Sequence, residues 1–138
     1  MTLFVDTSVW SLAFRRDGQQ LGPEVHALIE ALASGDLVVT TGLVLQELLQ
    51  GFSGPKAASE LLFRFQDIPL IPPTRESHVA AAALRNHCRR NGIQVGTVDA
   101  LIAQLCIENE LTLLSTDQDF GHISRHTSLK LLAFRPQS

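Results

Sequence analysis

The sequence predicts an α/β fold in which helices cover both faces of a mainly parallel β-sheet. Short apolar runs alternate along the chain with longer segments whose apolar residues repeat at helical spacing. This alternation is typical of consecutive β-α-β units, which are joined by right-handed crossovers. Ligands of such sheets bind beyond the carboxyl ends of the strands, so residues that follow a predicted strand are the first candidates for a functional site.

Five apolar runs are expected to form buried strands. They are residues 2–5, 37–40, 68–71, 111–114 and 129–133. Aliphatic side chains dominate each run, as expected of strands that are covered on both faces. The order of the strands in the sheet does not follow from these runs alone.

Four segments between the predicted strands have the periodicity of a helix with one buried face. Their repeating positions are Val25, Leu28, Ile29 and Leu32, then Ala58, Leu61, Leu62 and Phe65, then Ala80, Leu84, His87 and Cys88, and finally Val98, Leu101, Ile102, Leu105 and Cys106. Gly35 is expected to end the first of these helices, and Thr97 to cap the last. Residues 42–52, if helical, add a core face made of Leu45, Leu48, Leu49 and Phe52.

Composition indicates a globular protein that is not expected to insert into a membrane. The 138 residues fit one domain spanning residues 1–138, and 45% of them are hydrophobic. The longest stretch without Asp, Glu, Lys or Arg, residues 37–46, is far shorter than the roughly 20 residues of a membrane helix. No apolar leader precedes Asp6. Cys88 and Cys106 lie in helical patterns and are expected to be reduced thiols, so we expect a cytoplasmic protein.

Acidic residues follow predicted strands or lie on predicted helices. Asp6 directly follows the first strand, where the alternative role is to cap the next helix. Glu47 has no cation three or four residues away, and the alternative is a solvated helix face. Asp99 lies in a first helical turn, where it also complements the helix dipole. Asp117 and Asp119 follow the fourth strand, and Asp is common in turns.

A shared site explains these acids better than separate local roles do. Parallel packing brings the loops after the strands and the early turns of the helices to one edge of the sheet. Carboxylates about 4–5 Å apart repel by about 1 kcal/mol per pair in water, and by more where solvent is excluded. A fold keeps such a cluster by raising pKa values or by binding a cation. Oxygen ligands without nearby Cys or paired His favour Mg²⁺ or Mn²⁺ over zinc.

Four motifs, in this order, resemble those of a PIN domain. They are Val5-Asp6-Thr7-Ser8-Val9-Trp10, Gln46-Glu47-Leu48-Leu49-Gln50-Gly51, Asp99-Ala100-Leu101-Ile102-Ala103 and Thr116-Asp117-Gln118-Asp119-Phe120. More narrowly, the sequence looks like the VapC-type toxins of prokaryotic toxin–antitoxin pairs. The resemblance covers essentially the whole chain, and no acidic position departs from the family's pattern.

The resemblance implies a sheet of strand order 3-2-1-4-5 and a Mg²⁺-dependent endoribonuclease, with Mn²⁺ as a substitute, that cleaves RNA phosphodiester bonds by metal-activated water. It also implies a toxin of a type II system that inhibits translation and growth until a VapB-type antitoxin neutralises it, and a homodimer. The implied catalytic and metal-binding residues are Asp6, Glu47, Asp99 and Asp117, with Asp119 as an additional metal ligand and Thr116 and Ser8 as supporting residues.

The net charge of −3 does not indicate a strongly basic nucleic-acid binder, so RNA contacts must be local. Candidates for these contacts are Arg15, Arg16, Arg85, Arg89 and Arg90. For Arg89 and Arg90 the alternative is the preference of a helix C-terminus for cations, and for Arg15 and Arg16 it is simple surface exposure. The aromatic pair Trp10 and Phe14 is expected to pack rather than to stack on bases.

Two functions of other classes are alternatives to a ribonuclease. One is a non-catalytic PIN-like binding module, which intact acidic positions disfavour. The other is a phospho-accepting receiver domain, which needs an acid pair at the first strand and a lysine at a strand end. Asp6 has no adjacent acid, and lysine occurs only at positions 56 and 130.

Overall fold

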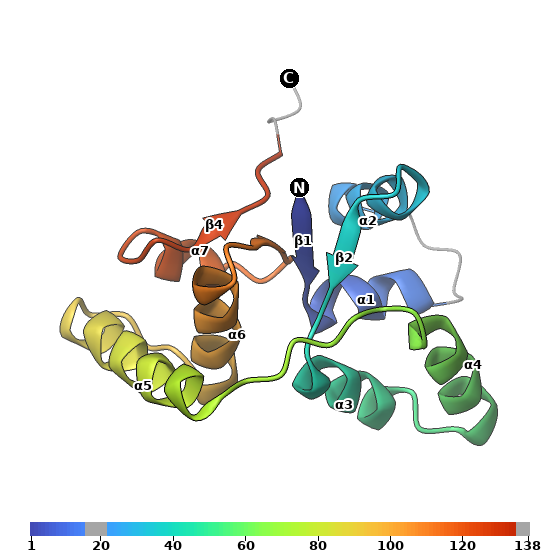
Figure 1. Ribbon diagram of the computed structural model, residues 1–138, viewed down its shortest axis with the longest axis horizontal. Coiled ribbons are helices and arrows are strands. Elements are labelled where there is room, and N and C mark those ends of the chain that lie inside the picture. Colours follow the sequence, from blue (N-terminus) through green and yellow to red (C-terminus); the bar gives the residue numbers. More distant parts are fainter. Residues whose placement is uncertain (16–21, 135–138) are drawn as a thin grey trace.

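Figure 1 shows a central sheet of parallel strands with helices packed around it. This computed structural model describes residues 1–15 and 22–134. The strands are β1 (Thr2–Val5), β2 (Leu37–Val39), β3 (Thr112–Leu114) and β4 (Lys130–Leu131), and their order in the sheet is β2-β1-β3-β4. All pairings are parallel, so the predicted α/β fold is confirmed.

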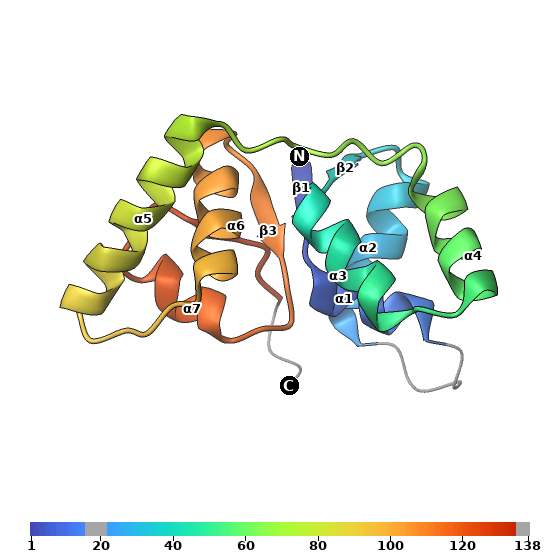
Figure 2. The same ribbon diagram turned by 90° about the horizontal axis from the view of Figure 1, so that it is seen from below.

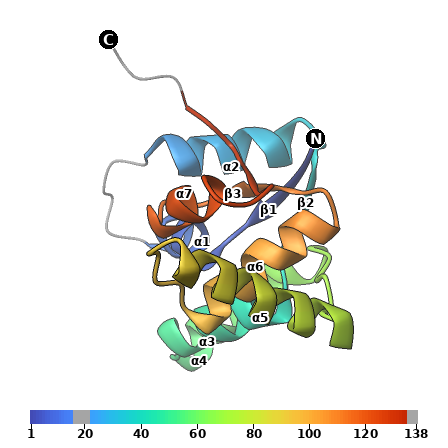
Figure 3. The same cartoon turned by 90° about the vertical axis from the view of Figure 1, so that its left-hand side faces the viewer.

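The helices lie on both sides of the sheet. They are α1 (Thr7–Phe14), α2 (Pro23–Ala33), α3 (Gly42–Gly51), α4 (Pro55–Phe65), α5 (Arg75–Arg90), α6 (Thr97–Glu108) and α7 (Asp119–Ser124). In Figure 3, α2 lies on one side of the strands, and α5 and α6 lie on the other. None of the helices in the described part of the chain has the length and apolar character needed to cross a lipid bilayer.

The strand predicted at residues 68–71 is wrong, because that segment forms only an isolated parallel bridge between Thr40 and Leu70. The Thr40 N–H donates to the Pro69 carbonyl over 3.1 Å, and the Ile71 N–H donates to the Thr40 carbonyl over 2.7 Å. Proline at 69 and again directly after Ile71 has no N–H, so the ladder cannot continue. The bridge still lies beside β2, where the order 3-2-1-4-5 places a third strand.

Several predicted boundaries also differ from the structure. The strands β2 and β3 are each one residue shorter than the predicted runs 37–40 and 111–114. The residue that caps α6 is Gly96, whose backbone is extended, and Thr97 is the first helical residue, so the predicted Thr97 cap is wrong. The last strand covers Lys130–Leu131 rather than residues 129–133, because it pairs with only two residues of the short β3.

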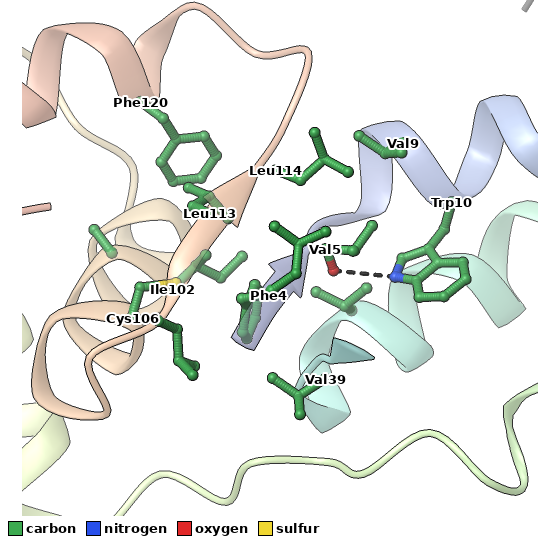
Figure 4. Close-up of a cluster of buried hydrophobic side chains, with 14 of the residues drawn as sticks. Phe4, Val5, Val9, Trp10, Val39, Ile102, Cys106, Leu113, Leu114 and Phe120 are labelled. Carbon is green, nitrogen blue, oxygen red and sulfur yellow. Dashed lines mark hydrogen bonds between the residues drawn. The ribbon is translucent and has the colours of Figure 1, made fainter. Parts of the chain in front are cut away.

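The core is centred on β1. Phe4 and Val5 have no exposed surface, and Cys106 is a buried free thiol, as expected from the sequence. The Trp10 indole N–H donates to the Val5 carbonyl over 3.0 Å, which fixes α1 against the end of β1 (Figure 4). Thr40 directly follows β2, and its hydroxyl donates to the same carbonyl over 2.9 Å. The carboxyl end of β1 is therefore held from both sides, directly before Asp6.

Candidate metal centre

Asp6 lies between the end of β1 and the first residue of α1, and its side chain is buried, with 5% of the residue exposed. Both of its carboxylate oxygens accept hydrogen bonds. Oδ1 accepts from the Ser8 N–H over 3.2 Å and from the Ser8 hydroxyl over 2.6 Å, while Oδ2 accepts from the Ser115 hydroxyl over 2.7 Å. Asp6 therefore does act as a helix cap, and it also ties α1 to the segment that follows β3.

Ser115 is a residue of this site that sequence reasoning missed. Its hydroxyl donates to Asp6 and accepts from the Asp117 N–H over 2.9 Å. The strand register could have identified it: Val5 pairs with Leu114, so the residues that follow these two lie side by side. Asp6 and Ser115 are those residues, one place beyond the paired strand ends.

The two supporting residues named from the sequence behave differently. Ser8 is half-buried, and its hydroxyl donates to Asp6 and accepts from the Thr116 N–H over 3.0 Å. Thr116 is exposed and takes part in this network through its backbone. The polar side chain that supports the site from this loop therefore belongs to Ser115 rather than to Thr116.

The loop after β3 and the start of α6 bring three carboxylates together. Oxygen atoms of Asp99, Asp117 and Asp119 all lie within 4.8 Å of one another. Asp99 is half-buried in the first turn of α6, and the other two are exposed. The Asp119 N–H donates to Asp117 Oδ1 over 2.9 Å, which fixes the turn that carries both side chains.

Asp6 and Glu47 lie outside this group of three but belong to the same electrostatic environment. Glu47 is exposed on α3, and its Oε1 accepts from the Thr7 hydroxyl of α1 over 3.3 Å. Burial, and then the charges of Asp117, Asp119, Asp6 and Glu47 in that order of strength, together raise the pKa of Asp99 to about 6. The other four acids predicted from the sequence therefore lie near enough for their charges to reach Asp99.

The pKa of Asp6 is also raised, chiefly because the carboxyl is buried. Hydrogen bonds from Ser8 and Ser115 and from the backbone act in the opposite direction. Asp6 is thus an acid whose charge is stabilised by fixed donors, whereas the charge of Asp99 faces other acids.

The donor set fits a hard divalent cation. Within residues 1–15 and 22–134, no lysine, arginine or histidine forms a salt bridge with any of these acids. The carboxylates are therefore gathered without a positive partner from those residues, and a bound cation offsets such repulsion. Carboxylate oxygens without a thiolate or imidazole are ligands that Mg²⁺ and Mn²⁺ prefer.

The candidate RNA contacts lie in different surroundings. Arg85 donates from Nε to the Val95 carbonyl over 2.7 Å, and so braces the segment that leads into α6. Arg89 and Arg90 occupy the last turn of α5, as the helix dipole favours. Arg15 follows α1 and is exposed, while Arg16 lies outside the described residues.

A family model described as PIN domain matches residues 3–126 of the chain. That stretch contains all of the acids described above. The search of curated proteins found no sequence that matches this one.

Solved structures of toxin–antitoxin proteins have similar folds. VapBC2 from Rickettsia felis, bound to a DNA fragment from its promoter, is 21% identical, with 98% of this chain and 100% of that chain covered and a TM-score of 0.77. VapBC-5 from Mycobacterium tuberculosis is 23% identical, with 96% of this chain and 98% of that chain covered and a TM-score of 0.69. VapC20 from Mycobacterium tuberculosis, a toxin that cleaves the sarcin-ricin loop, is 21% identical, with 86% and 92% covered and a TM-score of 0.65. At these identities the likeness concerns the fold.

Proposed function

The chain belongs to the PIN domain family, and from that premise we propose that it is a Mg²⁺-dependent endoribonuclease, the toxin of a type II toxin–antitoxin pair. One observation carries the proposal: Asp99, Asp117 and Asp119 place carboxylate oxygens within 4.8 Å of one another, without a salt bridge to any described cation. The cost of that arrangement is offset if the cluster binds a divalent cation beside a polyanionic substrate.

In this proposal the metal is held at the edge where β1, β3, α3 and α6 meet. Asp99, Asp117 and Asp119 supply the central ligands, with Asp6 and Glu47 completing the acidic surroundings. Mn²⁺ substitutes for Mg²⁺ because both prefer the same oxygen donors. When bound, such an ion polarises a phosphate and lowers the pKa of a coordinated water.

The chain's own residues position this chemistry. Asp6 holds Ser8 and Ser115, which in turn fix the backbone of the loop that carries Asp117. The Thr7 hydroxyl donates to Oε1 of Glu47 and so fixes this side chain beside the start of α1. The products of this hydrolysis are two RNA fragments, one with a terminal phosphate and one with a terminal hydroxyl.

Partners and location form the next part of the proposal. The antitoxin is of the VapB type, the toxin acts in the cytoplasm as a single-domain chain, and two copies form a homodimer. Support for the antitoxin comes from the fold shared with the toxin–antitoxin complexes. Support for an RNA substrate comes from the fold shared with a toxin that cleaves the sarcin-ricin loop.

The test is cleavage of total cellular RNA by the purified wild type and by Asp99→Asn, each with Mg²⁺, with Mn²⁺ and with EDTA. We expect discrete fragments from the wild type alone, and their loss in EDTA. Fragment end sequences then identify the target RNA. Equal cleavage by both proteins contradicts the assigned site, and no cleavage by the wild type under any condition favours a non-catalytic binding module.

A further inference from the structure

A second feature of the molecule is a pocket between α1, α4 and the segment that follows α3, which lie together in Figure 2. Its volume is about 690 Å³, within the roughly 300–1,000 Å³ range of pockets that hold small organic ligands. Phe14, Phe52 and Leu61 contribute to its lining. The rings of Phe14 and Phe52 lie 6.2 Å apart, edge to face.

The charge of this pocket is opposite to that of the metal centre. Among the described residues that line it, Arg15, Lys56 and Arg64 are cationic and Glu60 is the one acid. Glu60 lies 3.7 Å from Arg64, and the Arg64 guanidinium lies over the Phe14 ring, 5.8 Å from its centre. The pocket therefore combines aromatic rings with cationic side chains, although the net charge of the whole chain is −3.

Both α1 and α3 connect the pocket to the acids. α1 begins at Thr7, directly after Asp6, and ends at Phe14 in the pocket. Eight helical residues span about 12 Å at roughly 1.5 Å each. α3 carries Glu47 and is followed by Phe52. An RNA strand with one phosphate beside the acidic residues reaches the pocket within a few nucleotides, since stacked nucleotides are about 3.4 Å apart.

We propose that this pocket binds a nucleobase of the substrate RNA a few nucleotides from the scissile phosphate, with Lys56 and Arg15 contacting the adjoining backbone. The inference rests on the proposed ribonuclease function. Aromatic rings bind bases of any sequence by stacking, and nearby cations bind the phosphates between them. Charge complementarity therefore favours RNA over a neutral or basic peptide, which is the competing occupant.

Binding is measured by fluorescence anisotropy with a labelled single-stranded RNA of about 12 nucleotides and with an abasic strand of the same length. All proteins carry Asp99→Asn, so that the RNA stays intact. Lys56→Glu tests the phosphate contact, and Lys130→Glu, an exposed lysine on β4, is its matched control. Phe52→Leu tests stacking, and its thermal unfolding shows that the variant is folded.

We expect Lys56→Glu to weaken binding of both strands about 10-fold, and Lys130→Glu to change neither. Phe52→Leu is expected to weaken RNA binding by roughly 5- to 100-fold and to leave the abasic strand unaffected. Equal effects of the two lysine variants, or equal effects of Phe52→Leu on both strands, overturn the inference. If the variants bind RNA normally but no longer bind a peptide that neutralises the toxin, the pocket is the binding site of that peptide instead.

The two proposals fail separately. If the wild type cleaves RNA but no pocket variant changes RNA binding, only the nucleobase pocket is wrong. If RNA binding depends on Lys56 and Phe52 but the wild type cleaves nothing, only the nuclease proposal is wrong.

Discussion

The metal centre and the pocket lie at opposite ends of α1 and differ in charge and in construction. At the first, Asp99 and its acidic neighbours face one another, and short serine and backbone hydrogen bonds fix the loops that carry them. At the second, long cationic side chains surround aromatic rings. A net charge of −3 averages over both regions, so it neither reveals nor excludes contact with RNA.

The largest effect that separates the two regions is expected from Glu47→Gln. The substitution keeps the shape and the Thr7 contact but removes a negative charge from the metal centre. Loss of an outer-shell partner already lowers metal-dependent activity about 10- to 100-fold, so we expect RNA cleavage to fall by at least about 100-fold. Glu30→Gln, an exposed acid on α2, is the matched control and retains activity. Similar rates for both variants would remove Glu47 from the site.

A smaller effect is expected when the loop loses its serine support. Ser115→Ala leaves Oδ2 of the buried Asp6 without its donor, and an unsatisfied buried acceptor costs about 1–3 kcal/mol of the free energy of unfolding. Thr116→Ala removes an exposed side chain and should stay within about 0.5 kcal/mol. Urea denaturation of both variants measures the difference. Equal destabilisation would show that Ser115 does not support the carboxylate as described.

The smallest effect concerns pH and applies to the metal-free protein. In EDTA the folded state binds the Asp99 proton more tightly than the unfolded state does, because its pKa is raised from 3.8 to about 6. This contribution to the free energy of unfolding is fully present below about pH 4 and is lost as pH rises through about 6. Urea denaturation across that range should show a decline in the wild type that is smaller in Asp99→Asn, where only the raised pKa of Asp6 remains. Identical pH profiles would contradict the raised pKa.

Sequence patterns predicted the features that arise from periodicity. The helices α2 to α6, the parallel sheet and the placement of the acids after strands follow from apolar spacing. The predicted buried faces were too wide, because Ile29, Leu32 and Leu62 are exposed. The motif that contains Asp6 was informative because a strand end and a helix start coincide there, which leaves few arrangements for the carboxylate.

Features that depend on tertiary register were not predictable in the same way. Ser115 was overlooked in favour of Thr116 because the contact with Asp6 joins residues 109 positions apart and depends on how β1 pairs with β3. The segment at residues 68–71 looks apolar enough for a strand, but its prolines remove ladder donors. The pocket combines side chains from α1, from α4 and from the segment that follows α3, and none of these has a distinctive motif.

Calorimetric titration of Mg²⁺ and Mn²⁺ into the wild type and into Asp99→Asn at neutral pH tests the central claim most directly. If the carboxylates are gathered to hold a divalent cation, the wild type binds the ion and the loss of the Asp99 charge abolishes or greatly weakens binding. Absence of binding to the wild type, or equal affinity in the two proteins, would contradict the account of the metal centre.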